Sequence, residues 1–343
     1  MISPPAVRRA AVLFVAMSFS LSGCTAKPDT PDPTTETRTE MSATNSSVQE
    51  TSTRQISIVH ALGTTKLDAP AQTIVALDDP WADAVLMLHG TLVGYADTHA
   101  QGATLGNYLG GLLDEYGADA QVIGTPREPD FEMIAALKPD LIVGTRESSG
   151  EYYDRLSEIA PTVMSEGAPT TWKSGYLVLG KAMGAEPEAA ALLAEYEKQA
   201  RRIGDEINVK SANPTISVVR FQNGPTRIFA NASFPGMVLT DAGLSRPKSQ
   251  RGTQNFIKIT ADQVDAVAAD RIFMTMSPLG GERSLDSFRA TPQWTELDQR
   301  TVIADDAAWI TSESLPGAYA ILAELARAFD VSGPVVPDEL KPR

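Results

Sequence analysis

Arginine residues next to predicted strand ends are the side chains of this sequence best suited to binding an oxygen-rich ligand. Arg127, Arg146 and Arg283 each follow an apolar stretch that predicts a strand, or lie in the loop beyond it. Ligands of α/β proteins bind outside the carboxyl ends of such strands. A guanidinium there offers fixed positive charge and several donors in one plane, which suits an anionic or oxygen-rich shell. We therefore predict these three arginines as ligand-binding residues.

The sequence offers little to an enzyme mechanism or to a bound metal. It contains no G-x-S-x-G motif, and its single cysteine is Cys24. His60, His89 and His99 are scattered, and none stands at metal-ligand spacing with another histidine or a nearby carboxylate. We predict that the protein is not an enzyme and that it holds no metal and no cofactor. A secreted enzyme is the alternative of a different class.

The N-terminus has the pattern of an export signal that ends in a lipid attachment site. Arg8 and Arg9 precede an apolar run from Ala10 to Leu21, which is followed by Ser-Gly-Cys24. The run is shorter than the roughly 20 residues that a membrane-spanning helix needs. We predict a signal peptide over 1–23 and lipidation of Cys24, which would anchor the protein at the outer face of the cytoplasmic membrane. The alternative is an ordinary secretory signal with a chance cysteine.

Charge and composition describe the segment that follows. Residues 24–55 are rich in Thr, Ser, Pro and acidic residues, so we predict a disordered tether. Removal of a signal that contains Arg8 and Arg9 takes the formal charge from −14 to −16. This balance argues against nucleic acid as a partner and against an electrostatic hold on anionic lipid.

From Ile56 onward, predicted strands alternate with predicted helices, which indicates an α/β fold. One long amphipathic helix is predicted over 187–209, between lobes at 56–186 and 210–343. The chain left after signal removal is 320 residues, more than one core usually serves. The stretches 134–143 and 265–274 both place a short helix, an Asp and a buried strand in the same order. This echo suggests the same α/β unit in both lobes, and a chance match is the alternative.

Several motifs together resemble one family. They are EPDFEMIAALKPDLIVG at 128–144, LSEIAPTV at 156–163, SVVRF at 217–221, SFPGMVLTDAGLSRP at 233–247 and ITADQVDAVAADRIF at 259–273. In this order they resemble the iron-siderophore and cobalamin substrate-binding proteins of ABC importers, and the likeness spans nearly all of 56–330.

The resemblance implies a fold and a function. The fold would be two Rossmann-like lobes with parallel sheets, joined by one long helix, with the ligand in the cleft between them. The function would be capture of an iron(III)-siderophore complex and its delivery to an ABC importer permease. Haem and cobalamin are alternative ligands, but no His or Met is placed as an axial ligand, and the Arg and Trp residues suit an oxygen shell.

The same resemblance implies further site residues. Arg220 ends the strand within SVVRF at a position that matches the edge of the cleft, with a surface salt bridge as its alternative role. Tryptophans at the starts of helices match cleft positions, with a core role as the alternative, and a loop at 96–109 matches the cleft loop of the first lobe. These implied ligand contacts are Trp81, Trp172, Trp309, Tyr108 and His99.

Docking to the permease is implied for one acidic residue on each lobe. Glu132 matches the acid of the first lobe. In the second lobe, Thr240 stands where several family members have Glu, and the acid here is the next residue, Asp241. A shift of one position turns a helical side chain by about 100°. Asp241 is therefore the less secure of the two predictions.

Overall fold

The computed structural model describes residues 55–98, 105–167, 169–278 and 280–340. Cys24, His99, the predicted signal peptide and residues 24–54 of the predicted tether lie outside the described residues. Within the described part of the chain, no helix is long and apolar enough to cross a bilayer.

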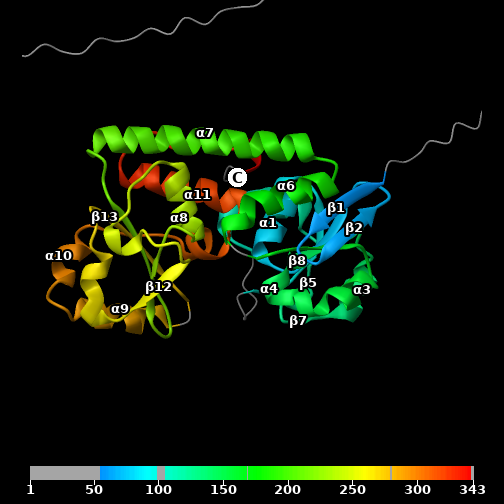
Figure 1. The fold of residues 1–343 in the computed structure, drawn as a ribbon, viewed down its shortest axis with the longest axis horizontal. Helices are drawn as coiled ribbons and strands as arrows, with labels where there is room; N and C mark the ends of the chain where they lie inside the picture. The colour runs from blue at the N-terminus through cyan, green and yellow to red at the C-terminus, as the bar shows by residue number, and fades with distance from the viewer. Residues whose placement is uncertain (1–54, 99–104, 168, 279, 341–343) are drawn as a thin grey trace, which may run out of the picture. The chain divides into compact units, whose positions relative to one another are not determined.

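The N-terminal lobe is built on a parallel sheet (Figure 1). Its central strand β3 is buried on both faces, with Ile74, Val75 and Ala76 all 0% exposed. Such burial on two faces is typical of parallel sheets covered by helices. The five strands, in spatial order, are β5 (Gln121–Val122), β4 (Thr91–Tyr95), β3 (Thr73–Ala76), β8 (Leu141–Thr145) and β9 (Thr162–Ser165).

The sheet of the C-terminal lobe is mixed, which differs from the parallel sheet that we expected. β10 pairs in parallel with β13, and β13 with β14, but β11 and β12 run antiparallel to their neighbours. The chain reverses after β10 at Gln222–Pro225, where Gly224 has a φ of 113° that favours glycine. The order is β12 (Phe256–Ile259), β11 (Thr226–Phe229), β10 (Ile216–Phe221), β13 (Arg271–Met276) and β14 (Thr301–Ile303).

One long helix, α7 (Glu186–Lys210), passes along both lobes (Figure 1). Pro187 stands in its first turn, where the missing amide hydrogen costs nothing. An apolar stripe that includes Leu193, Tyr196 and Ile203 is buried. Gly204 is required at its place, because a Cβ there would lie 1.6 Å from the carbonyl oxygen of Ala242. The predicted α/β fold with two lobes and one long connecting helix is confirmed.

The remaining elements cover the two sheets or extend them. The helices are α1 (Asp79–Met87), α2 (Leu112–Tyr116), α3 (Phe131–Leu137), α4 (Arg146–Ser149), α5 (Tyr153–Ser157), α6 (Trp172–Ala182), α8 (Phe234–Asp241), α9 (Gly281–Arg289), α10 (Trp294–Asp298) and α11 (Leu315–Ala328). Two hairpins pair β1 (Ile56–His60) with β2 (Gly63–Leu67), and β6 (Gly124–Thr125) with β7 (Glu128–Pro129).

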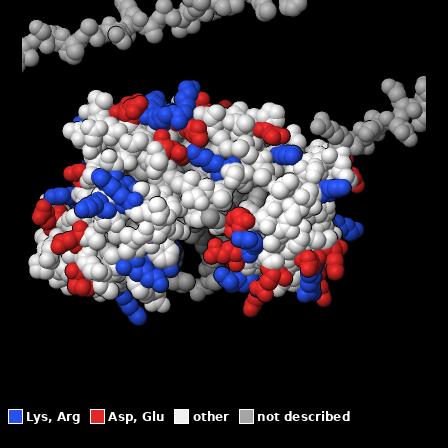
Figure 2. All heavy atoms as spheres, viewed as in Figure 1, with Lys and Arg blue, Asp and Glu red and all other residues white. Residues whose placement is uncertain are grey.

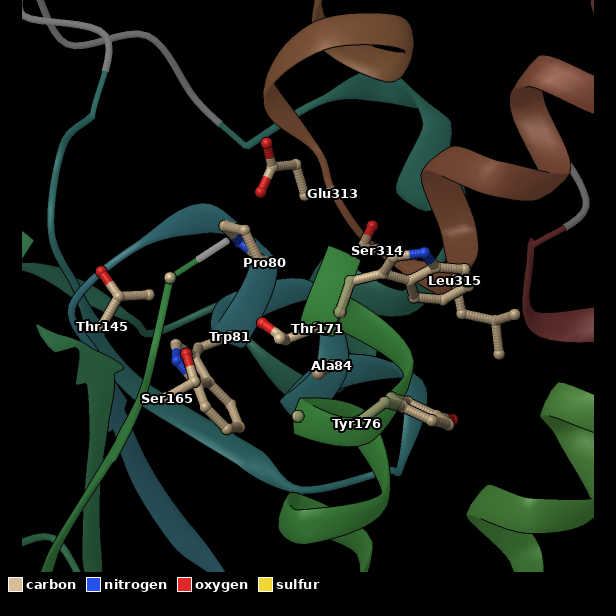
Figure 3. A pocket seen from close by; sticks show the side chains of 13 residues that line it. Pro80, Trp81, Ala84, Thr145, Ser165, Thr171, Tyr176, Glu313, Ser314 and Leu315 are labelled. Atoms are coloured by element: carbon tan, nitrogen blue, oxygen red, sulfur yellow. The ribbon is translucent and has the colours of Figure 1, made fainter. Parts of the chain in front are cut away.

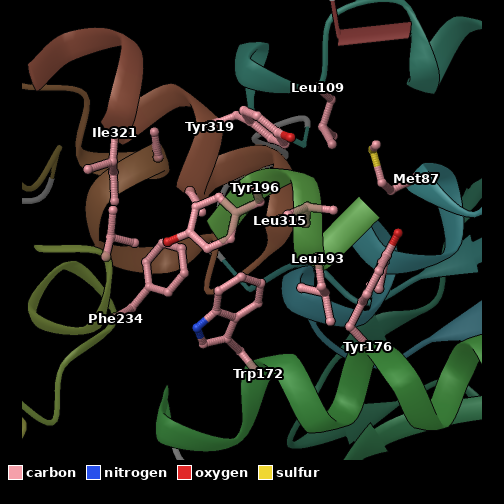
Figure 4. Close-up of a cluster of buried hydrophobic side chains, with 14 of the residues drawn as sticks. Met87, Leu109, Trp172, Tyr176, Leu193, Tyr196, Phe234, Leu315, Tyr319 and Ile321 are labelled. Atoms are coloured by element: carbon pink, nitrogen blue, oxygen red, sulfur yellow. The ribbon is translucent and has the colours of Figure 1, made fainter. Parts of the chain in front are cut away.

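The lobes share one hydrophobic core (Figure 4). Trp172 of α6 packs edge-on against Tyr196 of α7 and Phe234 of α8, each with ring centroids 5.7 Å apart. Tyr196 packs in the same way on Tyr319 of α11, at 5.8 Å. Because these rings join helices of both lobes, the described residues from 55 onward form one compact unit and not two independent ones.

The echo noticed in the sequence is present in the structure. Asp140 accepts a hydrogen bond from the backbone nitrogen of Thr73 at 2.9 Å, and Asp270 accepts one from the backbone nitrogen of Thr215 at 2.8 Å. Each Asp directly precedes a central strand, β8 or β13, and ties it to the start of a neighbouring strand. The two lobes therefore use the same short α/β unit.

Candidate ligand-binding cleft

The wall contributed by the N-terminal lobe lies at the carboxyl ends of its strands, where α/β proteins bind ligands. A cavity of about 50 Å³ opens there between the start of α1, the ends of β8 and β9, the start of α6 and the loop before α11 (Figure 3). Its lining is Pro80, Trp81, Ala84, Thr145, Ser165, Gly167, Thr171, Trp172, Gly175, Tyr176, Glu313, Ser314 and Leu315.

The structure brings two of the predicted tryptophans together at this cavity. Trp81 is 4% exposed, and its Nε1 donates a hydrogen bond to the carbonyl oxygen of Gly144 at 2.8 Å. Trp172 is 8% exposed. Both indoles belong to the lining, so their rings shape the floor of the cleft while they anchor α1 and α6.

Trp309 is a core residue, which contradicts its prediction as a ligand contact. It lies in a short π-helix over Ala307–Thr311 and is 0% exposed. Its ring stacks on Phe273 with centroids 4.6 Å apart, and its Nε1 donates to the Glu324 carboxylate at 2.8 Å. The indole has no free surface for a ligand because Phe273 and Glu324 occupy its face and its edge.

Carboxyl groups gather around the cavity. Burial, and then repulsion by Asp79, raises the pKa of Asp78 to about 7. Burial, and then repulsion by Asp78 and Glu147, raises the pKa of Glu313 to about 8. These two carboxyls come from different lobes, so their charges meet at the boundary between the lobes.

A third carboxylate, Asp83, joins the lobes through hydrogen bonds. It is 0% exposed and lies on α1. The Tyr108 hydroxyl donates to Asp83 Oδ2 at 2.8 Å, and the Ser314 hydroxyl donates to the same oxygen at 2.5 Å. Burial beside this carboxylate raises the pKa of Tyr108 well above its ordinary value. Tyr108, a predicted ligand contact, thus holds its loop against α1.

One face of the sheet in the C-terminal lobe carries a row of three cations, here called the basic row: Arg220, Arg227 and Lys258. Arg220 of β10 stands opposite Arg227 of β11, which stands opposite Lys258 of β12. Cross-strand partners point to the same face of a sheet. Figure 2 shows Lys and Arg side chains over the place of β12, beside a hollow between the lobes, and both acidic and basic side chains across it around α4.

Among the described residues, only one member of the basic row forms an ion pair with a carboxylate. Arg220 makes a two-bond ion pair with Asp306, at 2.8 Å from Nε and 2.6 Å from Nη2. The guanidinium of Arg227 lies 4.2 Å above the ring of Phe256. Desolvation, and then repulsion by Arg220, lowers the pKa of Arg227. The row therefore carries more positive charge than Asp306 cancels.

The other predicted arginines lie apart from one another. Arg127 is exposed in the turn between β6 and β7. Arg146 begins α4 and forms an ion pair with Glu166. Arg283 is exposed on α9 and lines a separate groove beside the turn Gln222–Pro225. Their position after predicted strands did not bring them into one site.

The two predicted docking residues, Glu132 and Asp241, differ in exposure and in their contacts. Glu132 is exposed at the start of α3, where Asp130 caps the helix. Asp241 is only 20% exposed in its side chain and pairs with Lys173 at 2.9 Å. The Tyr196 hydroxyl also donates to it, at 3.0 Å. The structure speaks against Asp241 as a docking residue because its carboxylate is already bound by a lysine and a buried tyrosine.

Histidine contributes no metal centre within the described residues, where no group of three potential His, Cys, Asp or Glu ligands is arranged around one point. His60 lies 3.0 Å from the Thr65 hydroxyl, and burial lowers its pKa. His89 stacks on Tyr116.

The sequence analysis missed Arg227, Lys258, Glu313 and Asp306. Arg227 precedes Ile228 and Phe229, residue types that favour a strand, but its register against β10 and β12 is not encoded in any local pattern. A signal was nevertheless present in the Gln-Asn-Gly-Pro stretch at 222–225, which is typical of a turn between antiparallel strands.

Comparison with known proteins shows which family this chain resembles. The family described as periplasmic binding protein matches residues 74–303. The chain is 27% identical over 304 residues to the probable siderophore-binding lipoprotein YfiY of Bacillus subtilis, covering 84% of this chain and 91% of that protein. It is 24% identical to the Fe(3+) dicitrate-binding periplasmic protein FecB of Escherichia coli, covering 78% and 88%.

A solved structure shares the fold. Staphylococcus aureus SirA complexed with staphyloferrin B superimposes with a TM-score of 0.72 at 24% identity. The match covers 80% of this chain and 99% of that one.

Proposed function

Because the chain belongs to the periplasmic binding protein family, we propose that it is an exported lipoprotein that binds an iron(III)-siderophore complex in the interlobe cleft and delivers it to an ABC importer. The basic row is the observation that carries the choice of ligand. YfiY is named as a probable siderophore-binding lipoprotein and FecB as a ferric dicitrate-binding protein, which supports the same choice.

The chemistry of the row fits such a ligand. The iron of a ferric siderophore is already coordinated by the oxygens of the siderophore, so the protein has to cover an anionic or oxygen-rich shell and need not ligate the metal. Arg220, Arg227 and Lys258 supply fixed positive charge along one sheet face. Guanidinium groups bind such oxygens through charge-assisted hydrogen bonds. Trp81 and Trp172 would cover the other side of the ligand from the floor of the cleft.

A pair of variants tests the ligand site. Replacing Arg227 and Lys258 together by methionine keeps the length of each side chain and removes both charges. We expect the dissociation constant for an anionic ferric siderophore, measured by isothermal titration calorimetry, to rise at least tenfold, since each charge-assisted hydrogen bond contributes about 1.5 to 3 kcal/mol. Lys66→Met, at an exposed position of β2, is the matched control. An unchanged constant in the double variant would remove the basic row from the site.

Delivery to the permease is proposed to use Glu132 and, in place of Asp241, Asp262. The repeated α/β unit supports this choice. Asp130 caps α3 two residues before Glu132, and Thr260 caps the short helix Ala261–Val267 two residues before Asp262. Both acids are exposed at the second position of equivalent helices.

Charge reversal tests the docking surface. Glu132→Arg combined with Asp262→Arg should abolish siderophore-dependent iron uptake by cells and leave the affinity in solution unchanged, because neither residue lines the cavity. Glu158→Arg, at another exposed acid, is the control. Uptake at the wild-type rate in the double variant would exclude these two acids as the docking pair.

A further inference from the structure

The cavity at the lobe boundary is lined by residues other than those of the basic row. It is closed by two indoles, Trp81 and Trp172, and by the loop that carries Glu313 (Figure 3). A site for one water requires about 10 to 15 Å³, so the cavity of about 50 Å³ can hold one small terminal group of a larger ligand. Because it lies at the carboxyl edge of the N-terminal sheet, a ligand in the cleft could extend such a group into it.

Glu313 has an unusual backbone conformation and a partly buried carboxyl. Its φ of 39° lies in the left-handed region, which costs a residue other than glycine on the order of 1 kcal/mol or more. The residue is half-buried, and within the described part of the chain its carboxylate has neither a hydrogen-bond partner nor an ion-pair partner. Partial burial without a partner disfavours the ionised form of this carboxyl, and a bound cation would favour it.

The electrostatics around Glu313 are acidic. Asp78 and Glu147 both repel its ionised form, and Asp79 in turn repels Asp78. Among the described residues that line the cavity there is no Lys, Arg or His. The lining therefore lacks the positive charge that this group of carboxyls would attract.

The lining also suits one kind of cation. A protonated amine in the cavity would lie beside the indoles of Trp81 and Trp172, and the electron-rich face of an aromatic ring attracts a cation. The hydroxyl oxygen of Ser165, which also lines the cavity, can accept one of its N–H groups. A metal ion would instead require several oxygen ligands in a closed shell, which two indole faces do not provide.

We propose that this cavity is a subsite for a primary alkylammonium group carried on an arm of the siderophore, with Glu313 as its counter-charge. This inference rests on the proposed function and narrows it. The ligand has an anionic ferric centre that faces the basic row and a cationic arm that faces the opposite wall. A carboxylate arm would be repelled in the cavity, and a neutral arm would leave Glu313 without a partner.

The test compares each ferric siderophore that has a free terminal amine with the same complex after acetylation of that amine. One pair is a trihydroxamate and the other a tricatecholate, both titrated at pH 8.5 by calorimetry. In the wild type we expect the amine form to bind about tenfold to a hundredfold more tightly than the acetylated form in at least one series. In Glu313→Gln, which keeps the shape of the side chain, this ratio should fall to near one. Glu158→Gln, at the exposed residue that follows α5, should keep it.

Each other outcome has a definite meaning. A wild-type ratio near one in every series that binds overturns the ammonium subsite and leaves the proposed function standing. A ratio that survives Glu313→Gln removes Glu313 as the counter-charge and also overturns it. If no ferric complex of either series binds, the proposed function fails and the subsite fails with it.

Discussion

The ion pair between Arg220 and Asp306 separates a structural role of Arg220 from a binding role. The two side chains are 16% and 14% exposed and share two hydrogen bonds. Removing one partner of a buried pair costs about 3 to 5 kcal/mol, because the remaining charge is left without compensation. Since this pair retains some contact with water, we expect Arg220→Ala to lower the free energy of unfolding by about 3 kcal/mol, at the lower end of that range.

The effect of the same variant on affinity has two sources. Arg220→Ala removes a guanidinium that would contact the ligand, and it also leaves Asp306 to repel an anionic complex. Together these should weaken binding by about tenfold to a hundredfold. Arg220→Lys should restore little if the contact is a planar fork. Asp306→Asn should do the opposite for affinity, because it frees Arg220 from its carboxylate, so the variant should bind an anionic complex at least as tightly as the wild type.

The assay is urea unfolding combined with calorimetric titration of one anionic ferric siderophore for all three variants. Both Arg220→Ala and Asp306→Asn should lose stability, and only the arginine variant should lose affinity. An unchanged dissociation constant for Arg220→Ala would mean that Arg220 serves only the ion pair. Weaker binding by Asp306→Asn would contradict the charge argument itself.

Three further predictions concern stability and anchoring. The pKa of Glu313 is raised to about 8, so its carboxyl stays protonated in the folded state at pH values where it ionises in the unfolded state; its contribution to stability is therefore full below about pH 4.5 and is lost as the pH rises through 8. Urea unfolding between pH 5 and 8.5 should show a smaller decline of stability with pH for Glu313→Gln than for the wild type. Equal slopes would contradict this. Gly204→Ala should lower the midpoint of urea unfolding substantially, because its Cβ cannot fit beside the carbonyl oxygen of Ala242; Gly333→Ala, with open space around it, is the control. Cys24→Ala should release the protein from the membrane fraction or leave its signal uncleaved, and a mature, membrane-bound variant would exclude lipidation at this residue.

Much of the fold follows from local patterns in the sequence. The apolar stripe of α7 and the buried runs of β3 and β8 repeat at helical and strand periods, so their types could be predicted. The antiparallel position of β11 and β12 could not be predicted in the same way, because it depends on which strand each one pairs with. Only the Asn-Gly turn after β10 indicated the reversal.

The site was less predictable because it depends on contacts between distant residues. Trp309 stands beside a helix start like Trp81, yet Phe273 and Glu324 enclose it. The residue that pairs with Asp241 is Lys173, which lies on another helix and far away in the sequence, so no local pattern reveals the ion pair. The basic row likewise exists only through strand register. By contrast, the repeated unit is visible in the sequence, because both copies need an Asp directly before the strand to accept a hydrogen bond from a neighbouring backbone nitrogen.

Intrinsic tryptophan fluorescence of the soluble protein, residues 25–343, titrated with a panel of ferric siderophores, iron-free siderophores, haem and cobalamin, tests the central claim most directly. Trp81 and Trp172 line the cleft, so an iron complex bound there should quench their emission. We predict saturable quenching with one site per protein by at least one ferric siderophore, and much weaker binding of its iron-free form. Saturable binding of haem or cobalamin with no response to any ferric siderophore would contradict the account.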